Sequence, residues 1–406
     1  MTIYFVAGEA SADNHGASLI RSLRELAPNL QFIGRGGPQM REVAGEQFTN
    51  WIGDAAVLGL WEVIRKYGYF REQFHQTLND IQQNKPAAVV LIDYPGFNLR
   101  LARALRKESP QQKIIYYISP QVWAWNRGRI KRMSRFIDLV LCIFPFEADL
   151  YNQSGLRALF VGHPMIERLQ AQKIDTERDP NLIGLFPGSR LREVRKIFPV
   201  MLHTLGELQR HNQNLRFEVA AGSAELAREM SEMLTPHLSL IHAPKGEVRV
   251  RGAASQDRQA IQIKVGETAA LMQRAFAGIV ASGSATLEAA YFRLPFVLIY
   301  KVAWPTYLAA RLVVNVKYLG MPNLLADREV VPEFIQHRAK PNAIAKAVRQ
   351  LLDHADARDR MITAFDDIVM DLGENGASER AARAIIMELK EQRSPDRRGD
   401  LEIALS

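Results

Sequence analysis

The residue whose type and position most favour catalysis is Asp93, which directly follows the apolar run 88–92. A carboxylate at the end of a buried strand is partly removed from water, and this raises its pKa towards the range in which it can accept a proton at neutral pH. Asp93 is therefore our candidate general base. The alternative is that Asp93 caps a turn before Pro95.

Two further segments suit an anion such as a phosphate. Residues 282–286 supply hydroxyl and main-chain N–H groups at the expected start of a helix, where the helix dipole favours negative charge. In residues 186–190, glycine allows close approach, and a guanidinium can pair bidentately with a diphosphate. For residues 282–286 the alternative is an ordinary strand-to-helix turn. The candidate anion-binding residues of these two segments are Gly188, Ser189, Arg190, Ser282, Gly283, Ser284 and Thr286, with Glu288 as a candidate acceptor for two ribose hydroxyls.

Residues 8–16 form another polar segment after an apolar run. Its small residues let the main chain approach a ligand, and its polar side chains stand at the expected start of a helix. The alternative is a capped turn with Ser11 or Asp13 as the N-cap. The glycine spacing of a dinucleotide-binding or Walker A loop is absent. The candidates for binding a phosphate or an acceptor are Glu9, Ser11 and Asp13 from this segment, together with Ser119 and Trp123 from residues 117–126.

Residues 117–126 contain Trp123 and Trp125 within one loop. Exposed aromatic area is costly unless it meets a ligand or partner, so this loop favours a binding role, with core packing of one tryptophan as the alternative.

Asn323 and Gln336 are either polar groups of the site or ordinary turn and helix residues. The segment 57–70 is apolar and aromatic between basic residues, which suits contact with acyl chains or a membrane, or else the core. Its candidate contacts are Val57, Leu60, Trp61, Ile64 and Phe70.

Composition and charge exclude several classes of protein. The 406 residues are enough for two domains, and the single cysteine, Cys142, excludes an internal disulfide and is expected to be a buried, inert thiol. No uncharged apolar run reaches the roughly 18 residues of a membrane span, and we see no signal peptide, so we expect a cytoplasmic protein. The net charge of +8 favours acidic partners, but no nucleic-acid module or zinc-ligand spacing occurs. No Asp-x-Asp pair is present either, so we expect no bound metal and no cofactor.

These segments must be positioned by strands and helices that alternate along the chain, a pattern typical of parallel sheets with crossover helices. We expect strands over residues 3–7, 31–34, 88–93, 113–119, 138–144, 159–162, 182–186, 217–220, 238–241, 261–265, 277–281 and 295–300. We expect helices over residues 16–26, 69–83, 99–107, 193–209, 225–234, 267–275 and 286–292. Loops after parallel strands collect ligands, so the pattern predicts a cleft between two α/β domains.

The expected boundaries follow from composition. Residues 1–169 form the first domain, and residues 170–340 form the second, beginning with a polar linker over 170–181. Residues 341–393 are expected to be helical, and residues 394–406 to be a flexible tail. The basic segment 244–258 is expected to be a solvated loop or hairpin.

The ordered set of motifs resembles the lipid-A-disaccharide synthase family of GT-B glycosyltransferases. The motifs are Gly8-Glu9-Ala10-Ser11, Asp93-Tyr94-Pro95-Gly96-Phe97-Asn98, residues 117–125, Pro145-Phe146-Glu147, Gly162-His163-Pro164, Pro187-Gly188-Ser189-Arg190, residues 282–288 and Pro322-Asn323. The resemblance implies a GT-B fold of two Rossmann-like domains with a C-terminal helical segment. It also implies transfer of diacylglucosamine from its UDP derivative to diacylglucosamine 1-phosphate by a peripheral protein on the inner face of the cytoplasmic membrane. The acceptor and its acyl chains would bind on the side of the first domain, 1–169, and the donor on the side of the second, 170–340.

Carried over by position, the family's essential aspartate corresponds to Asp93, its diphosphate-region arginine to Arg190, and its asparagine after proline to Asn323. The chain departs from the family pattern at Ala12, Gly96 and Ser284, where glycine, a second aspartate and threonine are frequent. The first is expected to tighten the phosphate-side turn, and the second leaves Asp93 as the sole base candidate. Two alternatives remain: another UDP-sugar GT-B enzyme, such as an epimerase or a transferase to a different lipid, and an inactive nucleotide-sugar-binding membrane protein.

Overall fold

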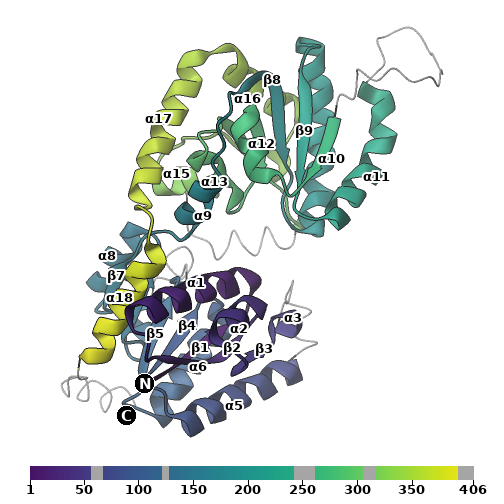
Figure 1. The fold of residues 1–406 in the computed structure, drawn as a ribbon. Coiled ribbons are helices and arrows are strands. Elements are labelled where there is room, and N and C mark those ends of the chain that lie inside the picture. The colour runs from purple at the N-terminus through teal and green to yellow at the C-terminus, as the bar shows by residue number, and fades with distance from the viewer. Residues whose placement is uncertain (56–66, 121–127, 242–260, 305–316, 392–406) are drawn as a thin grey trace. The chain divides into compact units, whose positions relative to one another are not determined.

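The computed structural model describes residues 1–55, 67–120, 128–241, 261–304 and 317–391, and it divides the chain into two compact units (Figure 1). Unit 1 is formed by Met1–Glu167 together with the C-terminal residues from Leu372 onwards, and unit 2 by Arg168–Asp371. The chain therefore enters unit 2 after residue 167 and returns to unit 1 at residue 372.

Unit 1 contains a parallel sheet of seven strands in the order β3-β2-β1-β4-β5-β6-β7. Its strands are β1 (Thr2–Ala7), β2 (Gln31–Gly36), β3 (Phe48–Asn50), β4 (Ala88–Ile92), β5 (Lys113–Tyr117), β6 (Leu139–Cys142) and β7 (Ala158–Phe160). Its helices are α1 (Ala10–Leu26), α2 (Pro38–Ala44), α3 (Ile52–Ala55), α5 (Tyr67–Asn84), α6 (Pro95–Glu108), α7 (Gly128–Met133), α8 (Pro145–Gln153) and α18 (Ala377–Lys390), and α9 (Met165–Ala171) spans the boundary.

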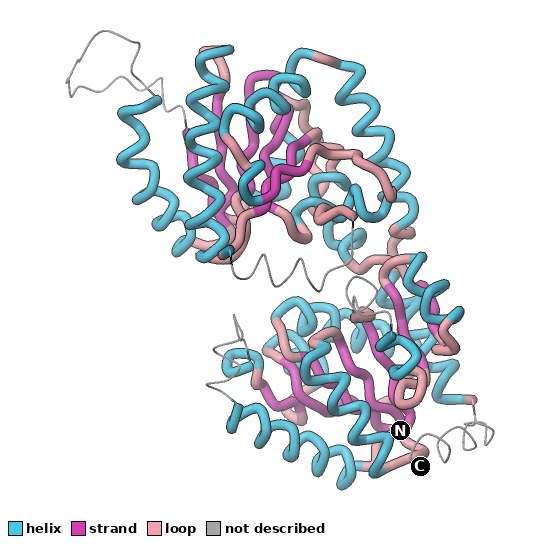
Figure 2. Tube along the Cα trace, turned by 180° about the vertical axis from the view of Figure 1, so that it is seen from behind, coloured by secondary structure: helices cyan, strands magenta, loops and turns pink. Residues whose placement is uncertain are grey.

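The central strands of unit 1 are buried on both faces, and Figure 2 shows helices on either side of the magenta sheet. Successive side chains of a strand point to opposite faces. In β1, Ile3 and Phe5 accordingly join a core cluster with α1 and α18, whereas Tyr4 and Val6 join a second cluster with α5 and α6. Both clusters are needed to cover a sheet whose strands are almost wholly apolar.

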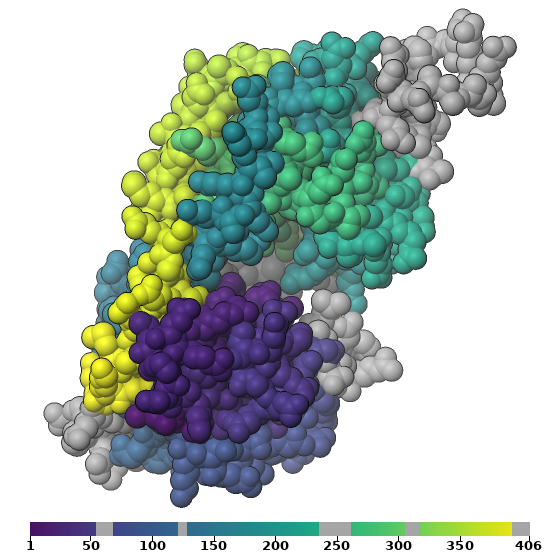
Figure 3. All heavy atoms as spheres, in the orientation of Figure 1, coloured from purple at the N-terminus to yellow at the C-terminus, as the bar shows by residue number. Residues whose placement is uncertain are grey.

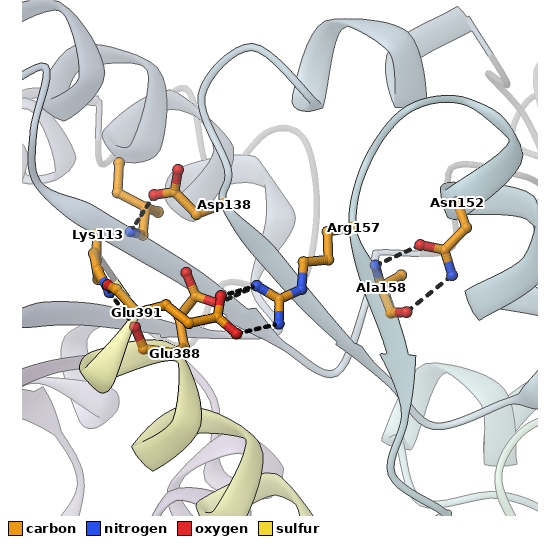
Figure 4. A network of polar contacts seen from close by, with 8 residues as sticks. Lys113, Asp138, Asn152, Arg157, Ala158, Glu388 and Glu391 are labelled. Atoms are coloured by element: carbon orange, nitrogen blue, oxygen red, sulfur yellow. Dashed lines mark hydrogen bonds and ion pairs between the residues drawn. The ribbon is translucent and has the colours of Figure 1, made fainter. Parts of the chain in front are cut away.

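The last described helix, α18, belongs to unit 1 and lies beside α1. Figure 3 shows the same pairing at the surface, where the yellow C-terminal atoms lie against the purple N-terminal ones. Polar contacts hold the end of α18 (Figure 4). Arg157, just before β7, pairs with Glu388 at 2.8 Å and with Glu391 at 2.6 Å, and the Lys113 ammonium donates to the main-chain oxygens of the same two residues.

Unit 2 contains a second parallel sheet, of six strands in the order β10-β9-β8-β11-β12-β13. Its strands are β8 (Asp179–Phe186), β9 (Arg216–Ala221), β10 (Ile261–Val265), β11 (Ala275–Ala281), β12 (Phe296–Tyr300) and β13 (Glu333–Ile335). Its helices are α10 (Leu191–His211), α11 (Ala224–Ile241), α12 (Thr268–Arg274), α13 (Ala285–Tyr291), α15 (Met321–Leu325), the 3-10 turn η2 (Gln336–Arg338), α16 (Pro341–Asp353) and α17 (Ala355–Asp371).

Three local predictions are wrong. Residues 238–241, expected as a strand, form the end of α11, because three apolar residues around Ser239 do not distinguish a short strand from a helix turn. The helix expected from Gly16 begins at Ala10, so most of the segment 8–16 is helix rather than loop. The expected linker 170–181 is shorter, since α9 ends at Ala171 and β8 begins at Asp179. The basic segment 244–258 lies outside the described residues.

Both sheets reverse their strand order at one place. In unit 1 the chain runs outward from β1 to β3 and then starts again at β4, on the other side of β1; in unit 2 the same reversal separates β8 from β11. At such a switch point the loops after the two central strands diverge and leave room for a ligand. The loops concerned begin at Gly8 and Asp93 in unit 1, and at Pro187 and Ser282 in unit 2.

Candidate active site

Asp93 lies at the carboxyl end of β4 and lines a pocket of about 370 Å³ in unit 1. The pocket extends across the ends of three adjacent strands, because β4 pairs with β5 and β5 with β6. Its other lining residues are Pro95, Ile118, Ser119, Pro120, Ile143, Phe144 and Glu147. The structure thus brings Asp93 and Ser119, two of the predicted site residues, to one pocket.

The main chain around this pocket adopts conformations that side chains disfavour. Asp93, Tyr94 and Ile118 have φ angles of 46°, 50° and 61°. Left-handed geometry is uncommon for any residue other than glycine and is an outlier for a β-branched one such as Ile118. Strain of this kind persists where the surroundings enforce it, and it gathers at functional sites.

Two buried side chains enforce the turn at Asp93. The Asn98 amide donates to the main-chain oxygen of Asp93 at 2.8 Å and to that of Ile92 at 3.2 Å. The Tyr116 hydroxyl donates to the same oxygen of Asp93. Since Tyr116 lies in β5 and Asn98 in α6, the turn is tied to the elements on both sides of it, and Asp93 is fixed in position. No single-residue signal in the sequence marked Tyr116, which lies inside an apolar strand.

The Asp93 carboxyl group has a perturbed acidity. Burial, and secondly the negative charge of Glu9, raise its pKa to about 6, while the Tyr94 main-chain N–H lowers it. Glu9 follows β1, the strand next to β4, and is exposed. The two loops are in close contact, because a side chain at Gly8 would meet the Tyr94 ring at 2.4 Å. Glycine at position 8 is what allows this approach.

Ser11 and Asp13 take different positions on α1. Asp13 is 2% exposed, and its carboxylate accepts the main-chain N–H groups of Gly37, Gln39 and Met40 at 2.8, 2.9 and 3.0 Å. It therefore caps the N-terminus of α2 rather than that of its own helix, whose N-cap is Glu9. Ser11 is exposed. Ala12 is fully buried within α1, so its replacement of glycine does not tighten a turn.

Ser119 contacts a residue that the sequence analysis did not select as a site residue. Its hydroxyl donates to Glu147 Oε2 at 2.6 Å, and the Phe144 main-chain N–H lies 3.4 Å from the same oxygen. Ser119 is 4% exposed, and Glu147 is fully buried. The signal for Glu147 was its place in the motif at residues 145–147, two residues into α8.

In unit 2 the loops after β8 and β11 lie next to each other. Gly188 has a φ angle of 111°, and a Cβ atom there would lie 2.8 Å from Glu193 Oε2 and 3.8 Å from the Ala281 Cβ. Arg190 is the N-cap of α10, and its guanidinium is 66% exposed, with Glu193 Oε1 at 3.2 Å. The sequence analysis missed Glu193. The pKa of Tyr300, at the end of β12, is raised by burial and by Glu193 and lowered by Arg190, so this aromatic group belongs to the same edge.

Two of the three hydroxyl groups of the 282–286 turn form hydrogen bonds within unit 2. Thr286 is fully buried and donates to the Gly283 carbonyl at 2.7 Å, and Ser282 donates to the Leu319 carbonyl at 3.3 Å. Ser284 is exposed, and its side chain does not cap α13. The Glu288 carboxylate pairs with Arg168 at 2.8 Å. Of the predicted donor-side groups in this turn, Ser284 is therefore the most accessible.

Asn323 is fully buried, and its amide bonds to the protein. Its oxygen accepts the main-chain N–H groups of Val330 and Val331 at 2.7 and 2.8 Å, and its nitrogen donates to the Val331 carbonyl and to Glu333 Oε1 at 2.8 and 2.9 Å. An amide of this kind holds a loop rather than offering free groups to a ligand. Gln336 is 4% exposed and donates to the Val302 carbonyl at 3.2 Å.

Several predicted residues lie outside the described residues, namely Val57, Leu60, Trp61, Ile64 and Trp123. Phe70, from the same apolar patch, is half-buried and packs against the core cluster under α5 and α6. Cys142 is buried, as predicted, and burial raises the pKa of its thiol well above the usual range. Among the described helices, none combines the length and the apolar character that crossing a bilayer requires.

Comparison with known proteins identifies the family. Residues 3–386 match the family model described as lipid-A-disaccharide synthetase. The lipid-A-disaccharide synthase of Geobacter sulfurreducens is 35% identical over 398 residues, which are 96% of this chain and 98% of that protein. The chain belongs to the lipid-A-disaccharide synthase family. The family's enzyme from Syntrophus aciditrophicus is 36% identical over 388 residues, 94% of this chain and 96% of its own.

Solved structures relate the fold of this lipid-A-disaccharide synthase family member to nucleotide-sugar enzymes. A putative UDP-N-acetylglucosamine 2-epimerase from Listeria monocytogenes superposes with a TM-score of 0.60 at 12% identity, over 97% of this chain and 98% of that one. A glycosyltransferase of kitacinnamycin gives 0.58 at 14% identity, over 95% and 98%. At such low identity these likenesses show the fold alone, which is that of GT-B enzymes, as predicted.

Proposed function

We propose that this protein transfers 2,3-diacylglucosamine from its UDP derivative to 2,3-diacylglucosamine 1-phosphate, releasing UDP and forming a β(1→6)-linked disaccharide 1-phosphate. Membership of the lipid-A-disaccharide synthase family over nearly the whole chain supports this reaction. The observation that carries the catalytic assignment is the Asp93 carboxylate, which lines a pocket at the switch point of unit 1 and has a pKa of about 6.

Asp93 is the proposed general base. At pH 7 a carboxyl group with a pKa of about 6 is mostly ionised, yet basic enough to accept a proton. It removes the proton from the acceptor's 6-hydroxyl as that oxygen attacks the anomeric carbon of the donor. The bond from the anomeric carbon to the UDP oxygen breaks on the opposite face, UDP leaves with the electron pair, and the configuration inverts.

The donor's diphosphate is proposed to bind at the switch point of unit 2. The exposed guanidinium of Arg190 is available for bidentate pairing with phosphate oxygens, and Gly188 lets the main chain come close. Charge on the leaving UDP is stabilised by Arg190 and by main-chain N–H groups, so the reaction needs neither a metal nor a cofactor. Ser189, Ser282, Gly283, Ser284 and Thr286 complete this proposed site, with Glu288 and Asn323 at its border.

We also propose that the protein works as a peripheral protein at the inner face of the cytoplasmic membrane. Both proposed substrates carry acyl chains that partition into a bilayer, and the net charge of +8 favours an anionic lipid surface. Glu9, Ser11 and Trp123 remain proposed groups of the acceptor side, and residues 57–70 remain the proposed acyl contact.

The decisive experiment compares the wild-type protein with Asp93→Asn and Asp149→Asn, using both substrates and mass spectrometry of the products. Asp149 is an exposed aspartate on α8 and serves as the matched control. Loss of a general base lowers the rate by roughly 100- to 10,000-fold. We expect this loss for Asp93→Asn alone, with both variants folded by circular dichroism. Near wild-type transfer by Asp93→Asn would refute the assignment.

The same assay separates the alternatives. An isomerised UDP-sugar would indicate an epimerase, whose only support is the fold likeness at 12% identity. Tight binding of the UDP-sugar without turnover by the wild-type protein would indicate an inactive binding protein.

A further inference from the structure

The Ser119–Glu147 contact constrains what Ser119 can do in the pocket. Glu147 Oε2 faces the Phe144 main-chain N–H, so this oxygen acts as an acceptor. The Ser119 hydroxyl, 2.6 Å away, must then be the donor in their hydrogen bond. A serine has one proton, and here that proton is directed at Glu147.

What remains on Ser119 is acceptor capacity. The adjacent Cys142 thiol can take one part of it, the neighbouring Tyr151 hydroxyl donates to the Pro120 carbonyl, and the other part is left for the pocket. Ser119 and its carboxylate partner both line the pocket that contains Asp93. A ligand group bonded to Ser119 must therefore bring its own proton, as a hydroxyl or amide N–H does. An ionised phosphate oxygen has no proton to donate and does not match. The geometry thus favours the sugar of the acceptor over its phosphate as the partner of Ser119.

We propose that Ser119 accepts a hydrogen bond from the 4-hydroxyl of the acceptor sugar, and that Glu147 is the positioning residue that directs the Ser119 proton away from the substrate. This inference rests on the proposed function. In 2,3-diacylglucosamine 1-phosphate, positions 1, 2 and 3 are substituted, which leaves free hydroxyls at positions 4 and 6. The 6-hydroxyl is the nucleophile assigned to Asp93, so the 4-hydroxyl, on the adjoining part of the ring, is the remaining hydroxyl donor. The N–H of the 2-acylamino group is the other donor of the acceptor, and a 4-deoxy analogue, which keeps that N–H, separates the two.

Glu147 also has a structural role that any test must separate from this one. It is the third residue of α8, and its bond to the Phe144 N–H is one half of a capping box. Loss of the cap lowers stability but does not change which acceptor the enzyme prefers. The discriminating measurement is therefore the ratio of kcat/KM for the native acceptor to that for its 4-deoxy analogue.

The experiment measures this ratio for the wild-type protein, Ser119→Ala, Ser119→Thr, Glu147→Gln and Glu147→Leu. Ser154→Ala is the control, since the Ser154 hydroxyl bonds to Leu150 within α8 and the residue does not line the pocket. A neutral hydrogen bond corresponds to a roughly 3- to 10-fold effect. We expect the wild-type and Ser154→Ala proteins to lose this factor with the 4-deoxy acceptor, chiefly through KM.

Ser119→Ala is expected to lose the same factor with the native acceptor and nothing further with the 4-deoxy analogue, which is the signature of a direct contact in a double-mutant cycle. Ser119→Thr, which keeps the hydroxyl, is expected to restore the preference. Glu147→Gln keeps an oxygen that accepts from both Phe144 and Ser119 and is expected to keep the preference for the 4-hydroxyl, whereas Glu147→Leu has no acceptor, releases the serine proton and is expected to remove it. If Glu147→Leu fails to fold, the two Ser119 variants still decide the contact.

An unchanged 4-deoxy penalty in Ser119→Ala would overturn the inference. That outcome is independent of the Asp93 test, because it leaves transfer to the 6-hydroxyl intact. Retained transfer in Asp93→Asn would instead overturn the general-base assignment, and failure of the wild-type protein to form disaccharide would overturn the proposed function.

Discussion

Asp93 destabilises the folded protein in two ways. Its main chain adopts a left-handed conformation, and its carboxyl group is partly buried beside Glu9, so that its pKa is raised from 3.8 to about 6. A carboxyl with a raised folded-state pKa favours the folded state while it is protonated, and that contribution is lost as the pH rises through about 6. A residue that is costly in both respects is typical of a site kept for chemistry.

The same acidity predicts a pH profile. Protonated Asp93 cannot act as a base, so kcat/KM is expected to fall below pH 6, with a limiting slope of one. Glu9→Gln removes a like charge and should shift this acidic limb to lower pH by a fraction of a unit, since burial is the larger cause and Glu9 is exposed. Glu46→Gln, an exposed carboxylate in the turn before β3, is the control. If the acidic limb of the kcat/KM profile lies at the same pH in Glu9→Gln as in the wild type, the two carboxylates are not coupled.

Asn323 and Arg190 should respond differently to truncation. Asn323→Ala leaves buried N–H groups at Val330 and Val331 without their acceptor, and unsatisfied buried groups cost about 1–3 kcal/mol each. We expect a loss of several kcal/mol in the free energy of unfolding, measured by urea denaturation. Arg190→Ala, at an exposed side chain, should change stability by less than about 0.5 kcal/mol but weaken UDP binding in calorimetry. If Asn323→Ala weakens UDP binding without lowering stability, Asn323 is a ligand contact instead.

At the scale of elements, α18 completes the core of unit 1 from the far end of the sequence. Its apolar face buries Ala381, Ala382 and Ile385 in the cluster shared with α1 and β1. The contacts of Arg157 and Lys113 fix the end of the helix, as Figure 4 shows. Because this cluster lies directly under the strand that leads to Glu9, α18 supports one side of the pocket region without contributing a residue to it.

Two positions on α18 test its contribution. Ile385 is fully buried, so Ile385→Ala should cost about 2–5 kcal/mol. Met387, on the same helix, is 61% exposed, and Met387→Ala should be close to neutral. Thermal unfolding measured by calorimetry should show a lower Tm for the first variant alone. Equal effects would mean that α18 does not pack as described.

The elements with a strong apolar pattern of their own could be predicted from the sequence. Apolar runs such as residues 88–92 and 277–281 became central strands, and the loops after them became the switch-point loops, because a buried parallel strand is apolar throughout its length. The edge strands β3 and β13 were missed, since each is three residues long and contains polar residues.

The contacts within the site were less predictable. Asp13 looked like a free polar group, yet it caps α2, and Asn323 looked like a ligand contact, yet its amide is used by the protein. Each partner is distant in sequence or hidden in a short loop, so no local pattern marks it. Tyr116 and Glu147 were overlooked for the same reason. Their hydrogen-bond partners, Asp93 and Ser119, follow neighbouring strands, and which strands are neighbours is known only from the fold.

At the scale of the whole molecule, both units place their candidate residues at the reversal of a parallel sheet. In unit 1 these residues are Glu9 and Asp93, and in unit 2 they are Arg190 and Ser284. The same architectural rule thus locates the proposed base and the proposed diphosphate site independently.

The net charge of +8 predicts how the protein meets a membrane. We expect it to sediment with phosphatidylglycerol vesicles at about 0.1 M salt and to be largely released at about 1 M salt, because the screening length falls from about 10 to about 3 Å. Phosphatidylcholine vesicles are the control and should bind weakly at both salt concentrations. Binding that ignores lipid charge and salt would point to an apolar contact instead.

The return of the chain to unit 1 at Leu372 sets the order in which the protein can be completed during its synthesis. Everything in the sheet of unit 1 has been made by Phe160, but α18, which covers one face of this sheet together with α1, begins at Ala377. At about 5–20 residues per second, a ribosome needs about 10 to 45 s for the roughly 220 residues between them. During that time the part of this apolar face that α18 covers stays exposed while unit 2 is synthesised. The nascent chain is then most exposed to aggregation and to chaperones, and substitutions that weaken α18 should lower the yield of folded protein in cells.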